Sequence, residues 1–123
     1  MFEQMRSDLA ARLKVLMNRF DAIVTRADHI RSDAEQAQRL GLPAGQTISL
    51  VTEIFSKADQ QLGLCGESIT LLLVNRSLPL MFKRDVSKAE DFAKQCEARL
   101  NEIDHARQTG REAFRSRFAI QDE

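Results

Sequence analysis

Two histidines and two cysteines are the side chains of this 123-residue chain best suited to nucleophilic or metal chemistry, and they are spread over three separate segments. His29 and His105 lie off the apolar positions of their segments, where the phosphoryl acceptor of a histidine phosphotransfer bundle would also lie. Neither histidine is followed by a lysine that would pair with a phosphate or by an adjacent glycine. We therefore expect surface histidines, and a histidine phosphotransfer module is the second alternative function.

Metal binding and acid–base catalysis need ligands or carboxylates at close spacing, as in Cys-x-x-Cys. Cys65 and Cys96 instead fall on apolar positions, where a free thiol packs as a small hydrophobe. The carboxylates Glu53 and Glu67 fall on polar flanks. The sequence therefore predicts no enzyme, no metal and no cofactor.

Arginine is concentrated in the C-terminal segment, where Arg107, Arg111 and Arg115 are spaced by four residues and Arg117 lies beside them. Such an end can contact phosphate groups even on a neutral protein. However, Lys plus Arg and Asp plus Glu number 18 each, and Tyr and Trp are absent, so neither net charge nor base stacking favours nucleic acid. We interpret the stripe as a solvated helix end, and a nucleic-acid-binding accessory protein is the first alternative.

Three apolar repeats must position all of these groups. Apolar residues alternate at spacings of three and four from Leu9 to Ala37, from Ile48 to Leu72 and from Ala89 to Phe114. A mean spacing of 3.5 residues is typical of long helices packed side by side. We predict an all-α, up-down-up bundle of three long antiparallel helices with coiled-coil-like packing, a single domain over 1–123 with helices at about 2–39, 47–77 and 87–118.

Local signals suggest where these helices begin and end. Gly41 and then Pro43 predict the end of the first helix, and Thr47 is a candidate N-cap for the second. Pro79 is expected to break the second helix, and the Ser-x-x-Glu pattern from Ser87 to Glu90 predicts a capping box for the third.

Two glycines inside the second repeat, Gly63 and Gly66, leave the alternation in phase. We expect a continuous helix through both, with close approach of a bulky neighbour such as Phe20 as their reason, although the sequence leaves open whether they break it.

Charges beside the repeats predict how the helices pair. Arginines recur every seven residues on the first helix and acids every seven on the third, on flanks that face each other when two helices run parallel. The expected inter-helix ion pairs join Arg12, Arg19 and Arg26 to Glu90, Glu97 and Asp104. The same register places Cys65 and Cys96 at similar heights, as possible neighbours without a disulfide.

The segment from 71 to 82, where the second predicted helix leads into the third, has more apolar residues than two neighbouring helices can bury. The excess predicts a partner-binding surface at the bundle end, composed of Leu71, Leu73, Val74, Leu80, Met81, Phe82, Phe2 and Met5. The sequence leaves open whether 78–82 binds a partner or caps the bundle. We expect a non-enzymatic protein–protein interaction module (an adaptor, small chaperone or assembly subunit) with a protein partner or a homodimer formed by helix packing.

The chain opens without a basic-then-apolar leader, and its apolar runs are too short to span a bilayer. The expected location is the cytoplasm, without a membrane partner.

Overall fold

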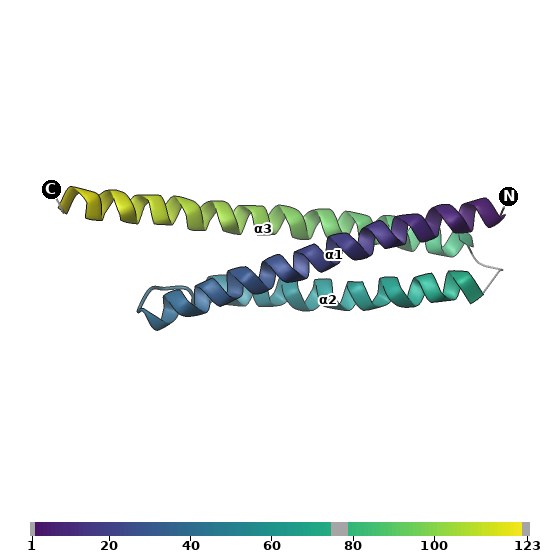
Figure 1. The fold of residues 1–123 in the computed structure, drawn as a ribbon, viewed down its shortest axis with the longest axis horizontal. Coiled ribbons are helices and arrows are strands. Elements are labelled where there is room, and N and C mark those ends of the chain that lie inside the picture. The colour runs from purple at the N-terminus through teal and green to yellow at the C-terminus, as the bar shows by residue number, and fades with distance from the viewer. Residues whose placement is uncertain (1, 75–78, 122–123) are drawn as a thin grey trace.

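The structure is a computed structural model that describes the backbone of residues 2–74 and 79–121 and the side chains of 3–74 and 83–110. Three helices account for the described backbone: α1 (Phe2–Arg39), α2 (Gly45–Val74) and α3 (Pro79–Gln121). They run up, down and up, and the C-terminal part of α3 extends past the α1–α2 turn (Figure 1). The predicted all-α three-helix bundle is confirmed.

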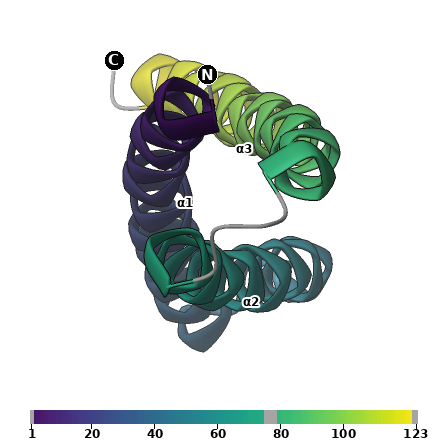
Figure 2. The same ribbon diagram turned by 90° about the vertical axis from the view of Figure 1, so that its right-hand side faces the viewer.

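Helix α1 is the central element because it packs against both of the others, whereas α2 and α3 contact each other far less. Figure 2 shows this arrangement along the bundle, with α1 joining α2 on one side to α3 on the other. The molecule therefore has two closed helix pairs and one loosely packed pair.

The apolar repeats form the core where these pairs close. Eight of the nine predicted positions of α1 are buried, and Ala37 is partly exposed. Phe20 lies at the centre with no exposed surface, and its ring centroid is 6.2 Å from that of Phe92 on α3. The buried positions that helix α3 contributes to the same core are Val86, Ala93, Cys96 and Leu100, of which Leu100 is the largest.

The end of α1 confirms the predicted stop signal. Gly41 has a φ of +87°, which places it in the left-handed region that glycine adopts without strain. Its N–H donates to the Gln38 carbonyl at 3.0 Å, and the Leu42 N–H donates to the Ala37 carbonyl at 3.0 Å. This pair of hydrogen bonds is a Schellman motif, and it satisfies carbonyls that the helix end would otherwise leave without partners.

The beginnings of α2 and α3 differ from the prediction. Helix α2 starts at Gly45, and the Ala44 carbonyl accepts a hydrogen bond from the Ile48 N–H at 3.0 Å, so Thr47 is inside the helix and is not its N-cap. Helix α3 starts at Pro79, eight residues before the predicted start. Proline suits the first turn of a helix because its missing N–H would have no intrahelical partner there.

The predicted capping box is wrong for the same reason. Ser87 lies within α3, and its Oγ accepts a hydrogen bond from Arg12 Nη2 of α1 at 3.2 Å. Residues 75–77, which we expected to continue the second helix, lie outside the described residues.

Helix α2 is continuous through Gly63 and Gly66, as predicted. The predicted reason for these glycines is wrong. A Cβ at Gly63 would meet nothing within 4 Å, and one at Gly66 would meet only the Met17 methyl at 3.9 Å, an ordinary contact. Neither glycine accommodates Phe20.

All three predicted ion pairs between α1 and α3 are present. Arg12, Arg19 and Arg26 each place Nη2 at 2.5 Å from a carboxylate oxygen of Glu90, Glu97 and Asp104, respectively. In the first two pairs Nε donates to the second carboxylate oxygen, at 3.3 and 3.4 Å. We call these three pairs the α1–α3 ladder. It sets the register of the two parallel helices.

Candidate protein-interaction surface

The start of α1, the end of α2 and the start of α3 lie at the same end of the bundle, as the predicted apolar end requires (Figure 1). Leu71, Leu73 and Val74 are 51, 74 and 76 % exposed. Met5 is only partly exposed and packs against the core. The side chains of Phe2, Leu80, Met81 and Phe82 lie outside the described residues.

The exposed residues of this end do not share one face. At 100° per residue, Leu71 and Leu73 lie on nearly opposite sides of α2. Leu71 instead aligns with two exposed leucines at intervals of seven residues, Leu50 and Leu64, which are 39 and 44 % exposed. We call Leu50, Leu64 and Leu71 the outer leucine row. Lys57 occupies the remaining position of this seven-residue series, between Leu50 and Leu64.

Sequence reasoning missed Leu50 and Leu64. The signal was present in the sequence, since positions 50, 57, 64 and 71 form a second seven-residue series beside the core series of α2. Because one of its four positions is a lysine, this series does not resemble a buried apolar series. Its three leucines nevertheless form a half-exposed stripe on α2.

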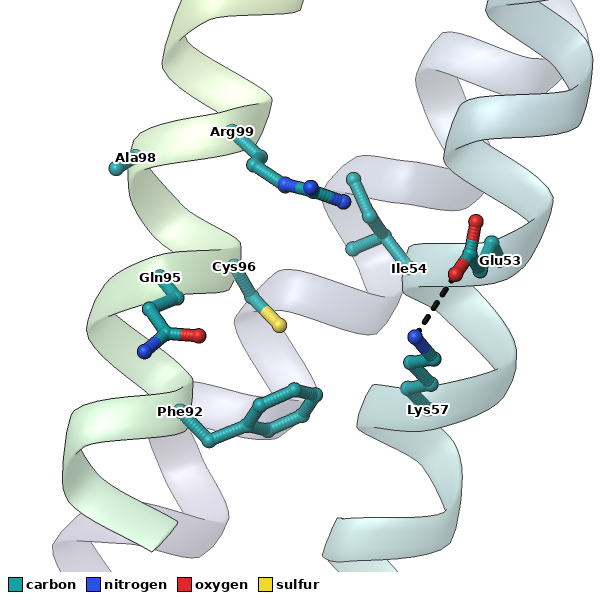
Figure 3. Close-up of a pocket in the computed structure, with 8 residues that line it drawn as sticks. All are labelled: Glu53, Ile54, Lys57, Phe92, Gln95, Cys96, Ala98 and Arg99. Carbon is teal, nitrogen blue, oxygen red and sulfur yellow. Dashed lines mark hydrogen bonds and ion pairs between the residues drawn. The ribbon is translucent and has the colours of Figure 1, made fainter. Parts of the chain in front are cut away.

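The outer leucine row lies beside a groove between α2 and α3. A hollow of about 350 Å³ separates Glu53, Ile54 and Lys57 from residues of α3 that include Phe92 and Cys96. In Figure 3 the Phe92 ring and the Cys96 sulfur project from α3 toward α2, and Arg99 reaches across the space between them.

A second hollow, of about 220 Å³, continues the groove along the same two helices. It lies between Leu64 and Cys65 of α2 and Val86 and Ala89 of α3, with Leu13 of α1 at its floor. The groove therefore follows the pair of helices that packs least closely.

The two cysteines line different hollows of this groove, so the predicted similar height is wrong. The cause is the early start of α3, which places each of its residues eight positions farther from the start of the helix than the predicted boundary allowed. Both thiols are free, and burial raises the pKa of each. They are therefore protonated at neutral pH and provide no thiolate nucleophile.

Charged side chains at the groove are exposed and form no ion pair between α2 and α3 among the described residues. Lys57 donates to Glu53 at 2.8 Å within α2, and this hydrogen bond lowers the pKa of Glu53, with a smaller contribution from Arg99 across the groove. Arg99 itself has no ion-pair partner within the described part of the chain. The groove thus presents an acid and a base of α2 that pair with each other, and an arginine of α3 that no described acid contacts.

The predicted arginine end is partly neutralised. Arg107 Nη2 lies 3.3 Å from Asp33 Oδ2, and its Nη1 lies 3.7 Å from Asp104 Oδ1. Arg31 pairs with Asp28 at 2.7 Å and stacks over the Phe55 ring at 4.8 Å. The side chains of Arg111, Arg115 and Arg117 lie outside the described residues. Arg107 and Arg31 are therefore each paired with an acid of the same molecule.

His29 and His105 are both exposed, as predicted, and they lie on different helices. Among the described residues, no three His, Cys, Asp or Glu side chains gather as metal ligands would. Within the same part of the chain, no helix has both the length and the apolar character that crossing a bilayer requires.

Comparisons with known proteins found no matching family model, no matching curated protein and no matching solved structure.

Proposed function

We propose that this protein is a non-enzymatic protein–protein interaction module, an adaptor, small chaperone or assembly subunit, that binds a helical partner through α2. The observation that carries the proposal is the outer leucine row, whose three leucines share one face of α2 and remain 39 to 51 % exposed. Helical surfaces of this kind recognise other helices by apolar anchors spaced at one or two turns.

Burial of this row contributes favourable free energy to binding. Full burial of a leucine contributes about 1.5–3 kcal/mol relative to full exposure. Leucines that are about half exposed therefore offer roughly 1 kcal/mol each on burial by a partner. The groove beside the row adds apolar walls, since Ile54, Phe92 and Cys96 line its larger hollow.

The predicted bundle end adds exposed apolar surface on other sides of α2. Leu73 and Val74 are about three-quarters exposed at the end of α2. Residues 79–82 belong to the first turn of α3, which argues against the alternative that they form a loop folded over the bundle end. The predicted contact residues Leu80, Met81 and Phe82 follow at the start of α3, and their side chains lie outside the described residues.

Site-specific photo-crosslinking in cells of the native source tests the proposal. A photoreactive phenylalanine analogue at Leu71 is expected to give discrete protein adducts. The matched control is the same analogue at Val15, which is 60 % exposed on α1 outside the groove. Adducts at position 71 but not at 15 support the proposal. Absence of adducts at 71, 64 and 73 would refute it.

A further inference from the structure

We infer that the α2–α3 groove receives one amphipathic helix of a different protein, which presents an acidic residue to the larger hollow and a basic residue to the smaller hollow. The inference rests on the proposed function and states the chemistry of its partner. It follows from the place of the groove in the bundle and from the charges that line the two hollows.

The groove is the open side of the bundle. Helix α1 packs against both α2 and α3, which contact each other far less (Figure 2). The walls of the groove are therefore α2 and α3, and Leu13 of α1 lies at its floor. A further helix seated between α2 and α3, opposite α1, completes a four-helix bundle. Its apolar side chains enter the two hollows as knobs enter holes, and they supply the contacts that these walls lack.

Both walls offer apolar surface to such a helix. Leu64 of α2 lines the smaller hollow and is exposed. Phe92 of α3 lines the larger hollow and is partly exposed. Between them along α3, Ala89 and Cys96 are small, and small side chains at a contact allow two helix axes to approach closely.

The two hollows carry excess charges of opposite sign. The larger hollow is lined by the bases Lys57 and Arg99 and by the acid Glu53. Glu53 is paired with Lys57, which leaves Arg99 without an acidic partner among the described residues. The smaller hollow is lined by the exposed acid Asp85, which no described base contacts. The groove is therefore positive at one hollow and negative at the other.

The spacing of these two charges suits a single straight helix. Arg99 and Asp85 are 14 residues apart on α3, which is about 21 Å at 1.5 Å per residue. Two heptads separate them, so both side chains lie on the same side of α3. A helix along the groove therefore meets Arg99 with an acid and Asp85 with a base two heptads away, beside its own apolar row.

The same spacing favours a different protein over a second copy of this chain. The exposed apolar row of α2 is flanked by Glu53 and Glu67, which are also 14 residues apart. Both are acids, whereas the charge of the groove changes sign over that distance. If α2 of a second copy entered the groove, one of its two glutamates would lie at the hollow that contains Asp85. The apolar repeat of α1 is already buried in the core.

Binding of two synthetic peptides to the full chain, measured by fluorescence anisotropy, tests the inference. Both are labelled helices of about four heptads with leucines at spacings of three and four. The mixed peptide has a glutamate and a lysine two heptads apart beside the leucines, and the acidic peptide has glutamate at both positions. The wild type is expected to bind the mixed peptide about three- to tenfold more tightly, because the acidic peptide exchanges one attractive pair for a repulsive one.

Asp85→Lys is expected to reverse this preference, because it makes the smaller hollow positive. Asp91→Lys is the matched control, since it makes the same change in charge at an exposed position of α3 that does not line either hollow. The control should keep the preference of the wild type. Circular dichroism checks that both variants retain the helices.

Photo-crosslinking to the mixed peptide locates the bound helix. A photoreactive phenylalanine analogue at Gln95 of α3 and one at Leu64 of α2 should both give the peptide adduct, because these residues line the two hollows from opposite walls. The same analogue at Lys94, the exposed neighbour of Gln95 outside the groove, should give none.

The inference would be overturned if neither peptide bound at several hundred micromolar, if both bound equally, or if Asp85→Lys left the preference unchanged. Adducts from Leu64 without adducts from Gln95 would also overturn it, because the peptide would then lie on α2 alone. A wild-type dimer that the mixed peptide dissociates would assign the groove to a second copy instead. The proposed function is decided separately by crosslinking at position 71 in cells, and it stands or fails whatever the two peptides do.

Discussion

The α1–α3 ladder predicts a measurable coupling energy in its middle pair. We consider replacement of Arg19 by Gln, of Glu97 by Gln, and of both together. Arg19 contacts both oxygens of Glu97, through Nη2 at 2.5 Å and Nε at 3.4 Å, and the two side chains are 28 and 39 % exposed. The double-mutant cycle isolates the pair from the other contacts of each residue.

The expected magnitude follows from this geometry. Unit charges 4 Å apart attract by about 4 kcal/mol near a protein surface, before desolvation and the ordering of two long side chains offset most of it. Measured exposed pairs retain about 0.2–1 kcal/mol. Because this pair is bidentate and partly shielded, we expect a coupling of about 0.5–1 kcal/mol.

Urea unfolding followed by circular dichroism measures the coupling, at a protein concentration where a single species is present. The Glu53–Lys57 pair is the control, because it has one hydrogen bond and both side chains are more than half exposed. It should give a smaller coupling. In 1 M salt the screening length falls to about 3 Å, so the Arg19–Glu97 value should decrease. A value indistinguishable from zero, or from the control, would refute the role of the ladder in setting the register.

Three further predictions concern single positions. Arg12 lowers the pKa of Glu90 below its ordinary value of 4.5. The stability that this carboxylate contributes is therefore present above pH 4.5 and is lost as the pH falls through the folded-state pKa. The difference in unfolding free energy between the wild type and Glu90→Gln, measured by urea unfolding, should shrink as the pH falls below 4.5. Phe20→Ala should cost about 3–5 kcal/mol in urea unfolding, because this side chain is fully buried, whereas Val15→Ala should change the free energy by less than about 0.5 kcal/mol. Gly63→Ala should raise the free energy of unfolding by about 0.5–1 kcal/mol, because Gly63 lies inside a helix with nothing within 4 Å of an added Cβ. Gly41→Ala should lower it by about 1–2 kcal/mol, because Gly41 has a positive φ. Equal effects at the two glycines would contradict the assigned backbone geometry.

The features that were predictable from the sequence depend on local patterns or on strict spacing. The end of α1 is encoded by a glycine that adopts a positive φ and a proline two residues later. The ladder was predictable because seven-residue spacing on two parallel helices fixes which charges meet, whatever lies between them. Burial along α1 followed from its uninterrupted apolar repeat.

The features that were missed depend on which of two roles a residue plays. A Ser-x-x-Glu sequence is the same whether it caps a helix or supplies two acceptors to Arg12 of another helix, as Ser87 and Glu90 do. Pro79 likewise can end one helix or begin the next. The wrong start of α3 also displaced every other α3 residue, because the position of each along the bundle relative to α2 depends on where α3 begins. The predicted proximity of Cys65 and Cys96 failed for that reason.

The outer leucine row was missed on physical grounds as well. A core series is identified by burial, and α2 has a complete core series without these residues. Their importance depends on how far α3 lies from α2, which no pattern within α2 reports.

The openness of the α2–α3 pair follows from how the other two pairs are held. The ladder fixes α3 to α1 by charges on one flank, and the large apolar residues of α1, such as Leu16 and Phe20, fill the space between α1 and its neighbours. Toward α2, helix α3 presents small residues at Ala89 and Cys96, and the side chains of Phe92 and Arg99 project into the groove without closing it. Any additional helix that joins this bundle therefore gains most by binding between α2 and α3, where apolar walls and unpaired charges are already positioned, and gains least on the outer face of α1.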